Sequence, residues 1–166
     1  PCPLCPTSVL CVHFQESPNI LAGTRIPTVT IKIEPIAGSK LPFPEKLGFG
    51  NVFSDRMFTQ TWTADNGWHD AKIGPFENIS LSPATAVFHY AQEIFEGTKA
   101  YRRPDGHINL FRPWENAQRF NRSAMRMAME LVDPESHVEA IAKLVELEHK
   151  WVPSGDGQSL YIRPTM

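Results

Sequence analysis

Alternating hydrophobic and polar residues predict β-strands in the first half of the chain. Residues 28–35, TVTIKIEP, carry valine or isoleucine at every second position, which is the period of a strand with one buried face. Residues 56–63 form a second predicted strand. Asp65-Asn66-Gly67 is then a strong turn signal before a third strand near 68–73. The pattern therefore indicates a hairpin that follows an isolated strand.

Three helices and a second hairpin follow. Proline after a helix-capping residue marks the expected starts of helices over 83–95 and 134–151, and another proline opens a helix over 113–131. A glycine shortly after the first helix would end it. Residues 98–103 and 107–111 flank a Pro-Asp-Gly turn. Strand pairs interleaved with helices predict an α+β fold, with an antiparallel sheet and packed helices.

The final predicted strand, at 159–164, combines an apolar face with a polar face. Alternation puts Leu160 and Ile162 on the first face, and Tyr161 and Arg163 on the second. A phenol beside a guanidinium offers donors that suit a carboxylate or a phosphate. The other interpretation is an edge strand with a solvated arginine, because the proline that follows removes a ladder donor.

The predicted helix over 113–131 has an apolar stripe and a basic side. At about 100° per residue, the stripe consists of Ala117, Phe120, Ala124, Met127, Ala128 and Leu131. Arg119, Arg122 and Arg126 fall on the opposite side. One interpretation is a solvated face, supported by an ion pair between Glu115 and Arg119. The other is that one of these arginines reaches an anionic group.

Composition fits an ordinary globular domain and removes several classes of function. Hydrophobic residues make up 42% of the 166 residues, and the net charge is −2. Nothing in this balance suggests binding to nucleic acid or to an anionic membrane. No apolar run approaches the roughly 18 to 20 residues of a membrane helix. The absence of a targeting signal favours a cytoplasmic location.

Residues 1–27 are expected to be a poorly ordered extension. Three of the first six residues are prolines, and no basic residue precedes Arg25, which is unlike a signal peptide. All three cysteines, Cys2, Cys5 and Cys11, lie in this stretch, whereas a disulfide framework would be spread through the fold. The CxxC spacing has no second ligand pair, so no metal or redox site is expected there.

Few motifs of known chemistry are present. The chain has no P-loop, dinucleotide glycine fingerprint, HExxH or nucleophile elbow, and its six histidines make no convincing ligand pair. Lys99 is a candidate nucleophile, because a desolvated lysine can react as an amine. Its polar neighbours argue against that role.

Four segments together resemble one family. LGFG at 47–50, YAQEIFEGTKAYR at 90–102, INLFRPWENAQRFNRSAMRM at 108–127 and SLYIRPTM at 159–166 occur in an order and spacing similar to the N-terminal small domain of branched-chain amino acid aminotransferases. These are pyridoxal phosphate enzymes of fold type IV, the D-amino-acid-aminotransferase-like fold. The resemblance covers residues 28–166.

The resemblance implies roles for six residues. Arg119 would bind the phosphate of pyridoxal 5'-phosphate, while Tyr161 and Arg163 would line the site and help to orient the substrate carboxylate. In the family, the counterpart of Tyr90 serves the site of a neighbouring subunit, which implies a homodimer. The walls of an apolar side-chain pocket would be Phe49, Tyr90 and Phe95.

The implied reaction is ping-pong transamination between leucine, isoleucine or valine and a 2-oxo acid, typically 2-oxoglutarate. In the family, the Schiff-base lysine belongs to a large domain after the SLYIRPT strand, and none of the seven lysines here lies in that context. These 166 residues alone are therefore expected not to transaminate. Three alternatives stay open: a D-amino acid aminotransferase, an aminodeoxychorismate lyase, and an inactive partner that dimerises with a complete aminotransferase.

Overall fold

The structure, a computed structural model, describes residues 30–45 and 47–166. Its first sheet has the order β1-β3-β2, with β1 at Lys32–Ile33, β2 at Arg56–Thr63 and β3 at Gly67–Pro75. The antiparallel β2–β3 hairpin is confirmed. The first predicted strand is shorter than expected, and its two-residue pairing with β3 is parallel. The predicted extension at 1–27 lies outside the described residues.

The second sheet has the order β5-β4-β6 and is antiparallel throughout. It consists of β4 at Thr98–Arg102, β5 at Ile108–Leu110 and β6 at Leu160–Ile162. The second hairpin is thereby confirmed, and β6 is an edge strand that ends before the proline, as predicted. The α+β fold class is confirmed, with the strands divided between two sheets.

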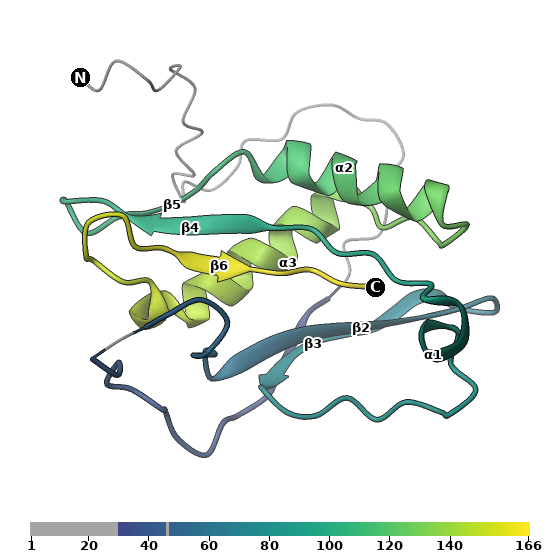
Figure 1. Cartoon of the computed structure of the whole chain (residues 1–166), viewed down its shortest axis with the longest axis horizontal. Helices are drawn as coiled ribbons and strands as arrows, with labels where there is room; N and C mark the ends of the chain where they lie inside the picture. Colours follow the sequence, from purple (N-terminus) through teal and green to yellow (C-terminus); the bar gives the residue numbers. More distant parts are fainter. Residues whose placement is uncertain (1–29, 46) are drawn as a thin grey trace.

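The helices are α1 at Ala86–Tyr90, α2 at Pro113–Arg126 and α3 at Pro134–Leu147, followed by a 3-10 turn at His149–Trp151. In Figure 1, α3 lies behind the sheets and α2 lies along the edge beyond β5 and β4. The Asp133 carboxylate accepts a hydrogen bond from the Ser136 N–H at 2.8 Å, which caps α3 as its sequence predicted. No helix in the described part of the chain has the length and apolar character needed to cross a membrane.

Two apolar clusters hold the layers together. The first lies between the second sheet and α3, and its buried members are Ala100, Leu110, Ile141, Val145 and Val152. Leu160 and Ile162 of β6 pack against it, which confirms the predicted apolar face of that strand. The second cluster consists of Ile94, Phe120 and Ala124, with Met166 packed against them.

The first predicted helix is wrong over most of its length. The sequence predicted a helix over 83–95, but α1 has five residues and ends at Tyr90, because the following Ala91 has a φ of 49° in the left-handed region. The Ile94 N–H instead donates to the Met166 carbonyl at 2.9 Å, and Met166 returns the bond at 3.0 Å. Pairing with a segment about 70 residues away outweighs the local preference for a helix.

The predicted apolar stripe of α2 is confirmed as far as Met127. Ala117, Phe120 and Ala124 are buried, and Met127 packs against the second cluster. The helix ends at Arg126, and the left-handed Ala128 turns the chain away, so Leu131 is 47% exposed. The predicted Glu115–Arg119 pair is also wrong, because Glu115 pairs with Arg112 in the preceding turn.

A buried polar network joins the end of α3 to the loop before β2. The Glu148 carboxylate accepts from the Asp55 N–H at 2.8 Å and from the Arg56 Nη1 at 2.7 Å. The Asp55 carboxylate in turn accepts from the Trp151 Nε1 at 2.9 Å. This network fixes where β2 begins relative to α3.

Candidate active site

Four of the six predicted site residues lie together in one cluster of rings and a guanidinium. The rings of Phe49 and Tyr161 meet edge to face, with centroids 5.3 Å apart. The Arg163 Cζ lies 4.8 Å from the centroid of the Phe95 ring and 5.3 Å from that of Tyr161. We call these four residues the aromatic-arginine cluster.

The cluster is positioned by strand alternation in β6 and by pairing of the segment before β4. Tyr161 of β6 and Arg163, the residue directly after the strand, lie on the same side of it, as the sequence predicted. Phe95 forms an isolated antiparallel bridge with Thr165, and the Glu96 N–H donates to the Pro164 carbonyl at 2.9 Å. Residues far apart in sequence are thus held side by side at the C-terminal segment (Figure 1).

Arg119 lies in an ion pair next to this cluster. Its Nε donates to Glu96 Oε2 at 2.6 Å, and its Nη2 donates to Glu96 Oε1 at 2.5 Å. The arginine side chain is 59% exposed, whereas the glutamate side chain is 7% exposed. Arg119 is therefore largely exposed and also reaches an anionic group, as the second interpretation of the basic side of α2 predicted.

The ion pair sets the charge state of this part of the site. The Arg119 guanidinium holds the pKa of Glu96 below its usual value, against an opposing effect of burial, and the Gly97 N–H adds to the lowering. Glu96 in return raises the pKa of Arg119. Burial lowers the pKa of the nearby His137, partly offset by the Glu96 charge. Glu96 and Arg119 are therefore both ionised at neutral pH.

Two residues beside the cluster, Glu96 and Gly97, had no site role predicted from the sequence. Gly97 was expected to end a helix, but it lies beneath the Tyr161 ring, and a Cβ there would overlap the tyrosine hydroxyl. Its carbonyl accepts from the Asn116 Nδ2 at 2.6 Å. Both residues belong to the FEG segment, Phe95-Glu96-Gly97, which directly precedes β4. That position next to Phe95 could have indicated a site role, but no local pattern linked Glu96 or Gly97 to α2 or β6.

Tyr90 lies outside the aromatic-arginine cluster. It is the last residue of α1, it is 82% exposed, and its nearest ring contact is with His89, at 6.3 Å between centroids. Lys99, in contrast, is the register partner of Tyr161 across β4 and β6, so it shares the outer face of that sheet with the cluster.

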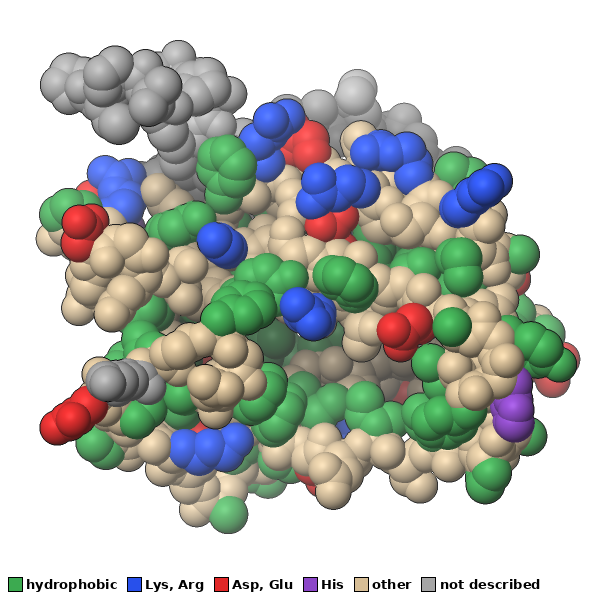
Figure 2. Space-filling model, viewed as in Figure 1, with side chains coloured by type: hydrophobic (Ala, Val, Ile, Leu, Met, Phe, Trp, Pro, Cys, Tyr) green, Lys and Arg blue, Asp and Glu red, His purple; other side chains and the backbone are tan. Residues whose placement is uncertain are grey.

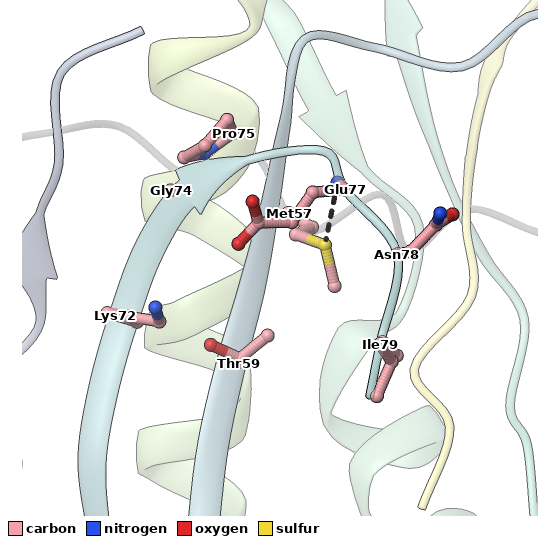
Figure 3. A pocket seen from close by; sticks show the side chains of 8 residues that line it. All are labelled: Met57, Thr59, Lys72, Gly74, Pro75, Glu77, Asn78 and Ile79. Atoms are coloured by element: carbon pink, nitrogen blue, oxygen red, sulfur yellow. Dashed lines mark hydrogen bonds between the residues drawn. The ribbon is translucent and has the colours of Figure 1, made fainter. Parts of the chain in front are cut away.

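Hydrophobic side chains surround a hollow between the two sheets on the face that carries the C-terminal segment (Figure 2). A cavity of about 160 Å³ lies on the β2–β3 face away from α3 (Figure 3). Met57, Thr59 and Lys72 line its floor, and the loop with Asn78 and Ile79 forms its side. None of the six predicted site residues lines this cavity.

Comparisons with known proteins identify relatives that match most of the chain. No protein-family model matches the chain. The chain is 50% identical over 123 residues to branched-chain-amino-acid transaminase 1 of Bacillus subtilis, covering 74% of this chain and 35% of that one. It is 46% identical over 137 residues to the cytosolic branched-chain-amino-acid aminotransferase of Saccharomyces cerevisiae, covering 82% of this chain and 36% of that one.

A solved structure, a T.th. branched-chain amino acid aminotransferase in complex with N-(5'-phosphopyridoxyl)-L-glutamate, overlaps with a TM-score of 0.47 at 32% identity. The overlap covers 56% of this chain and 29% of that one, so the assignment rests on the sequence identities. The chain spans about a third of the length of the curated relatives. The chain is therefore homologous to a segment of the branched-chain-amino-acid aminotransferases that makes up about a third of their length.

Proposed function

We propose that this chain is part of a branched-chain-amino-acid aminotransferase and forms one wall of its active site. The enzyme would move the amino group of leucine, isoleucine or valine to 2-oxoglutarate, giving a 2-oxo acid and glutamate. The observation that carries this proposal is the convergence of three rings and one guanidinium in a chain that is 50% identical to a transaminase over 123 residues.

The aromatic-arginine cluster has the two chemical features that these substrates require. The rings of Phe49, Phe95 and Tyr161 offer an apolar surface for a branched side chain. The Arg163 guanidinium lies over two of these rings, and its N–H donors suit a carboxylate. Such a surface would separate leucine from valine by only about 1 to 3 kcal/mol, the effect of one methylene.

Pyridoxal 5'-phosphate is the proposed cofactor, and Arg119 is the residue proposed to bind its phosphate. The residues fit an anionic group, because Arg119 is exposed, positively charged and fixed beside the cluster by Glu96. When bound, the cofactor supplies the electron sink for transamination. The lysine that this chemistry needs would come from the remaining two-thirds of a full-length enzyme.

The proposal also includes a homodimer and a cytoplasmic location. The exposed position of Tyr90, at the end of α1 and away from the cluster, is compatible with a role at the site of a neighbouring subunit. The yeast relative is named as the cytosolic enzyme, which supports the same compartment for this protein.

The test is a transaminase assay on the full-length protein that contains these residues. With pyridoxal 5'-phosphate, L-leucine and 2-oxoglutarate, we expect formation of glutamate. Arg163→Gln should lower kcat/KM for leucine about tenfold or more, because a charged hydrogen bond to the carboxylate is lost. Arg126→Gln, at the exposed end of α2, is the matched control and should have normal activity.

Three results would contradict this proposal. A full-length protein that prefers D-alanine would instead be a D-amino acid aminotransferase. If the full-length protein has no aminotransferase activity at all, the proposed function is wrong. Sustained leucine-dependent turnover by residues 28–166 alone would show that the proposed division of the site between two parts of the enzyme is wrong.

A further inference from the structure

We propose that Glu96 is a positioning residue for the cofactor phosphate. It would hold the Nε–Nη2 edge of the Arg119 guanidinium so that the adjoining Nη1–Nη2 edge stays directed at the phosphate. This inference rests on the proposed function, and it assigns a task to a buried carboxylate that does not itself touch the substrate or the cofactor.

The two hydrogen bonds of the pair use only one edge of the guanidinium. Glu96 accepts from Nε at 2.6 Å and from one hydrogen of Nη2 at 2.5 Å. A guanidinium has five N–H donors in one plane, so both hydrogens of Nη1 and the second hydrogen of Nη2 remain. No acceptor is bonded to Nη1 among residues 30–45 and 47–166. This end edge has the spacing that binds two oxygens of a phosphate.

Glu96 is rigid, whereas Arg119 would be mobile without it. The glutamate side chain is buried, its Oε1 also accepts from the Gly97 N–H at 2.7 Å, and its own N–H is bonded to Pro164. The Arg119 side chain is 59% exposed, and a free arginine at such a position samples many rotamers. The pair therefore prepares Arg119 in one orientation before any ligand binds.

Glu96 has two opposing effects on phosphate binding, repulsion by its charge and orientation of Arg119. The Glu96 charge repels a phosphate, but it bonds the adjoining edge of the guanidinium, and the exposed Arg119 side chain allows water to screen the repulsion. In Glu96→Gln one of the two hydrogen bonds is lost and the other becomes neutral, so Arg119 is held less firmly. We therefore expect orientation to outweigh charge, so that removal of the carboxylate weakens phosphate binding.

The test compares two probes on the full-length apoprotein, pyridoxal 5'-phosphate and pyridoxal, which lacks the phosphate. Dissociation constants come from absorbance titrations of wild type, Glu96→Gln, Arg119→Gln and the double variant. Glu96→Gln should raise the Kd of the phosphate form about tenfold and leave that of pyridoxal unchanged. In the Arg119→Gln background it should have no further effect. Glu115→Gln, the exposed partner of Arg112, is the control and should match wild type.

Several outcomes would overturn the inference. Unchanged or tighter binding of pyridoxal 5'-phosphate by Glu96→Gln would do so, as would an equal loss for both probes, which indicates only a structural role. If Glu96→Gln fails to fold, Glu96→Asp replaces it, and the same phosphate-dependent loss is required. A wild-type protein that binds neither probe contradicts the proposed function, and this inference with it.

Discussion

At position 97 the packing of a single side chain leaves room only for hydrogen. The Tyr161 ring covers this glycine, and it is itself held by the Phe49 ring and the Arg163 guanidinium. A methyl group at Gly97 would therefore displace a ring that has two other partners. The backbone conformation is not the reason, because Gly97 does not have a positive φ.

We expect Gly97→Ala to lower the free energy of unfolding by about 1 to 3 kcal/mol, the usual effect of overpacking. Denaturant unfolding measures the loss of stability, and near-UV circular dichroism should report the changed environment of the Tyr161 ring. Gly38→Ala is the matched control, because a Cβ there meets nothing within 4 Å. Equal stability and equal spectra for the two variants would show that Tyr161 does not pack on Gly97.

At the scale of elements, the buried Glu148 connects α3 to the first sheet. Glu148→Leu would leave the Asp55 N–H and the Arg56 guanidinium without their acceptor. Breaking a buried ion pair by removal of one partner usually costs about 3 to 5 kcal/mol, and we expect a loss of that size. Thermal and denaturant unfolding would measure it.

Glu146→Leu is the control for that experiment, because it lies two residues earlier and forms an exposed pair with Lys143. Exposed ion pairs contribute little, so its stability should stay close to wild type. If both variants lose the same stability, the effect comes from the helix rather than from the buried network.

Elements defined by local turn chemistry could be predicted from the sequence, and those defined by distant partners could not. Both hairpins follow from their turn residues, and α3 follows from the Asp133 cap. The outer face of β6 follows from alternation. The early end of α1 does not, because residues 94–96 pair with a segment about 70 positions away. For the same reason, Glu96 could not be recognised as the partner of Arg119.

At the scale of the whole molecule, the predicted site is an exposed surface. Phe49 is 71% exposed and Phe95 is 59% exposed, although both pack against the cluster. Apolar side chains gathered around a hollow usually mark a surface that another part of a protein covers (Figure 2). In the proposed enzyme, that cover would be the rest of the chain.

Residues 28–166 expressed alone should therefore self-associate. Sedimentation velocity should show a mean mass that rises with concentration, and the double variant Phe49→Ser, Phe95→Ser should reduce this rise. Ile79→Ser, which changes a side chain 63% exposed beside the β2–β3 cavity, serves as the control. A segment that stays monomeric, or one in which Ile79→Ser has the same effect, would contradict this expectation.

The extended FEG segment has a consequence for how this protein can evolve. Ile94 and Glu96 point toward α2, while Phe95 and Gly97 lie on the side of Arg163 and Tyr161. Consecutive residues of this segment thus face opposite sides, one toward α2 and the next toward the aromatic-arginine cluster. A single-codon deletion here would exchange the two sides at once, burying a ring where a carboxylate belongs. A change in the length of this segment should therefore be more damaging than any single substitution in it.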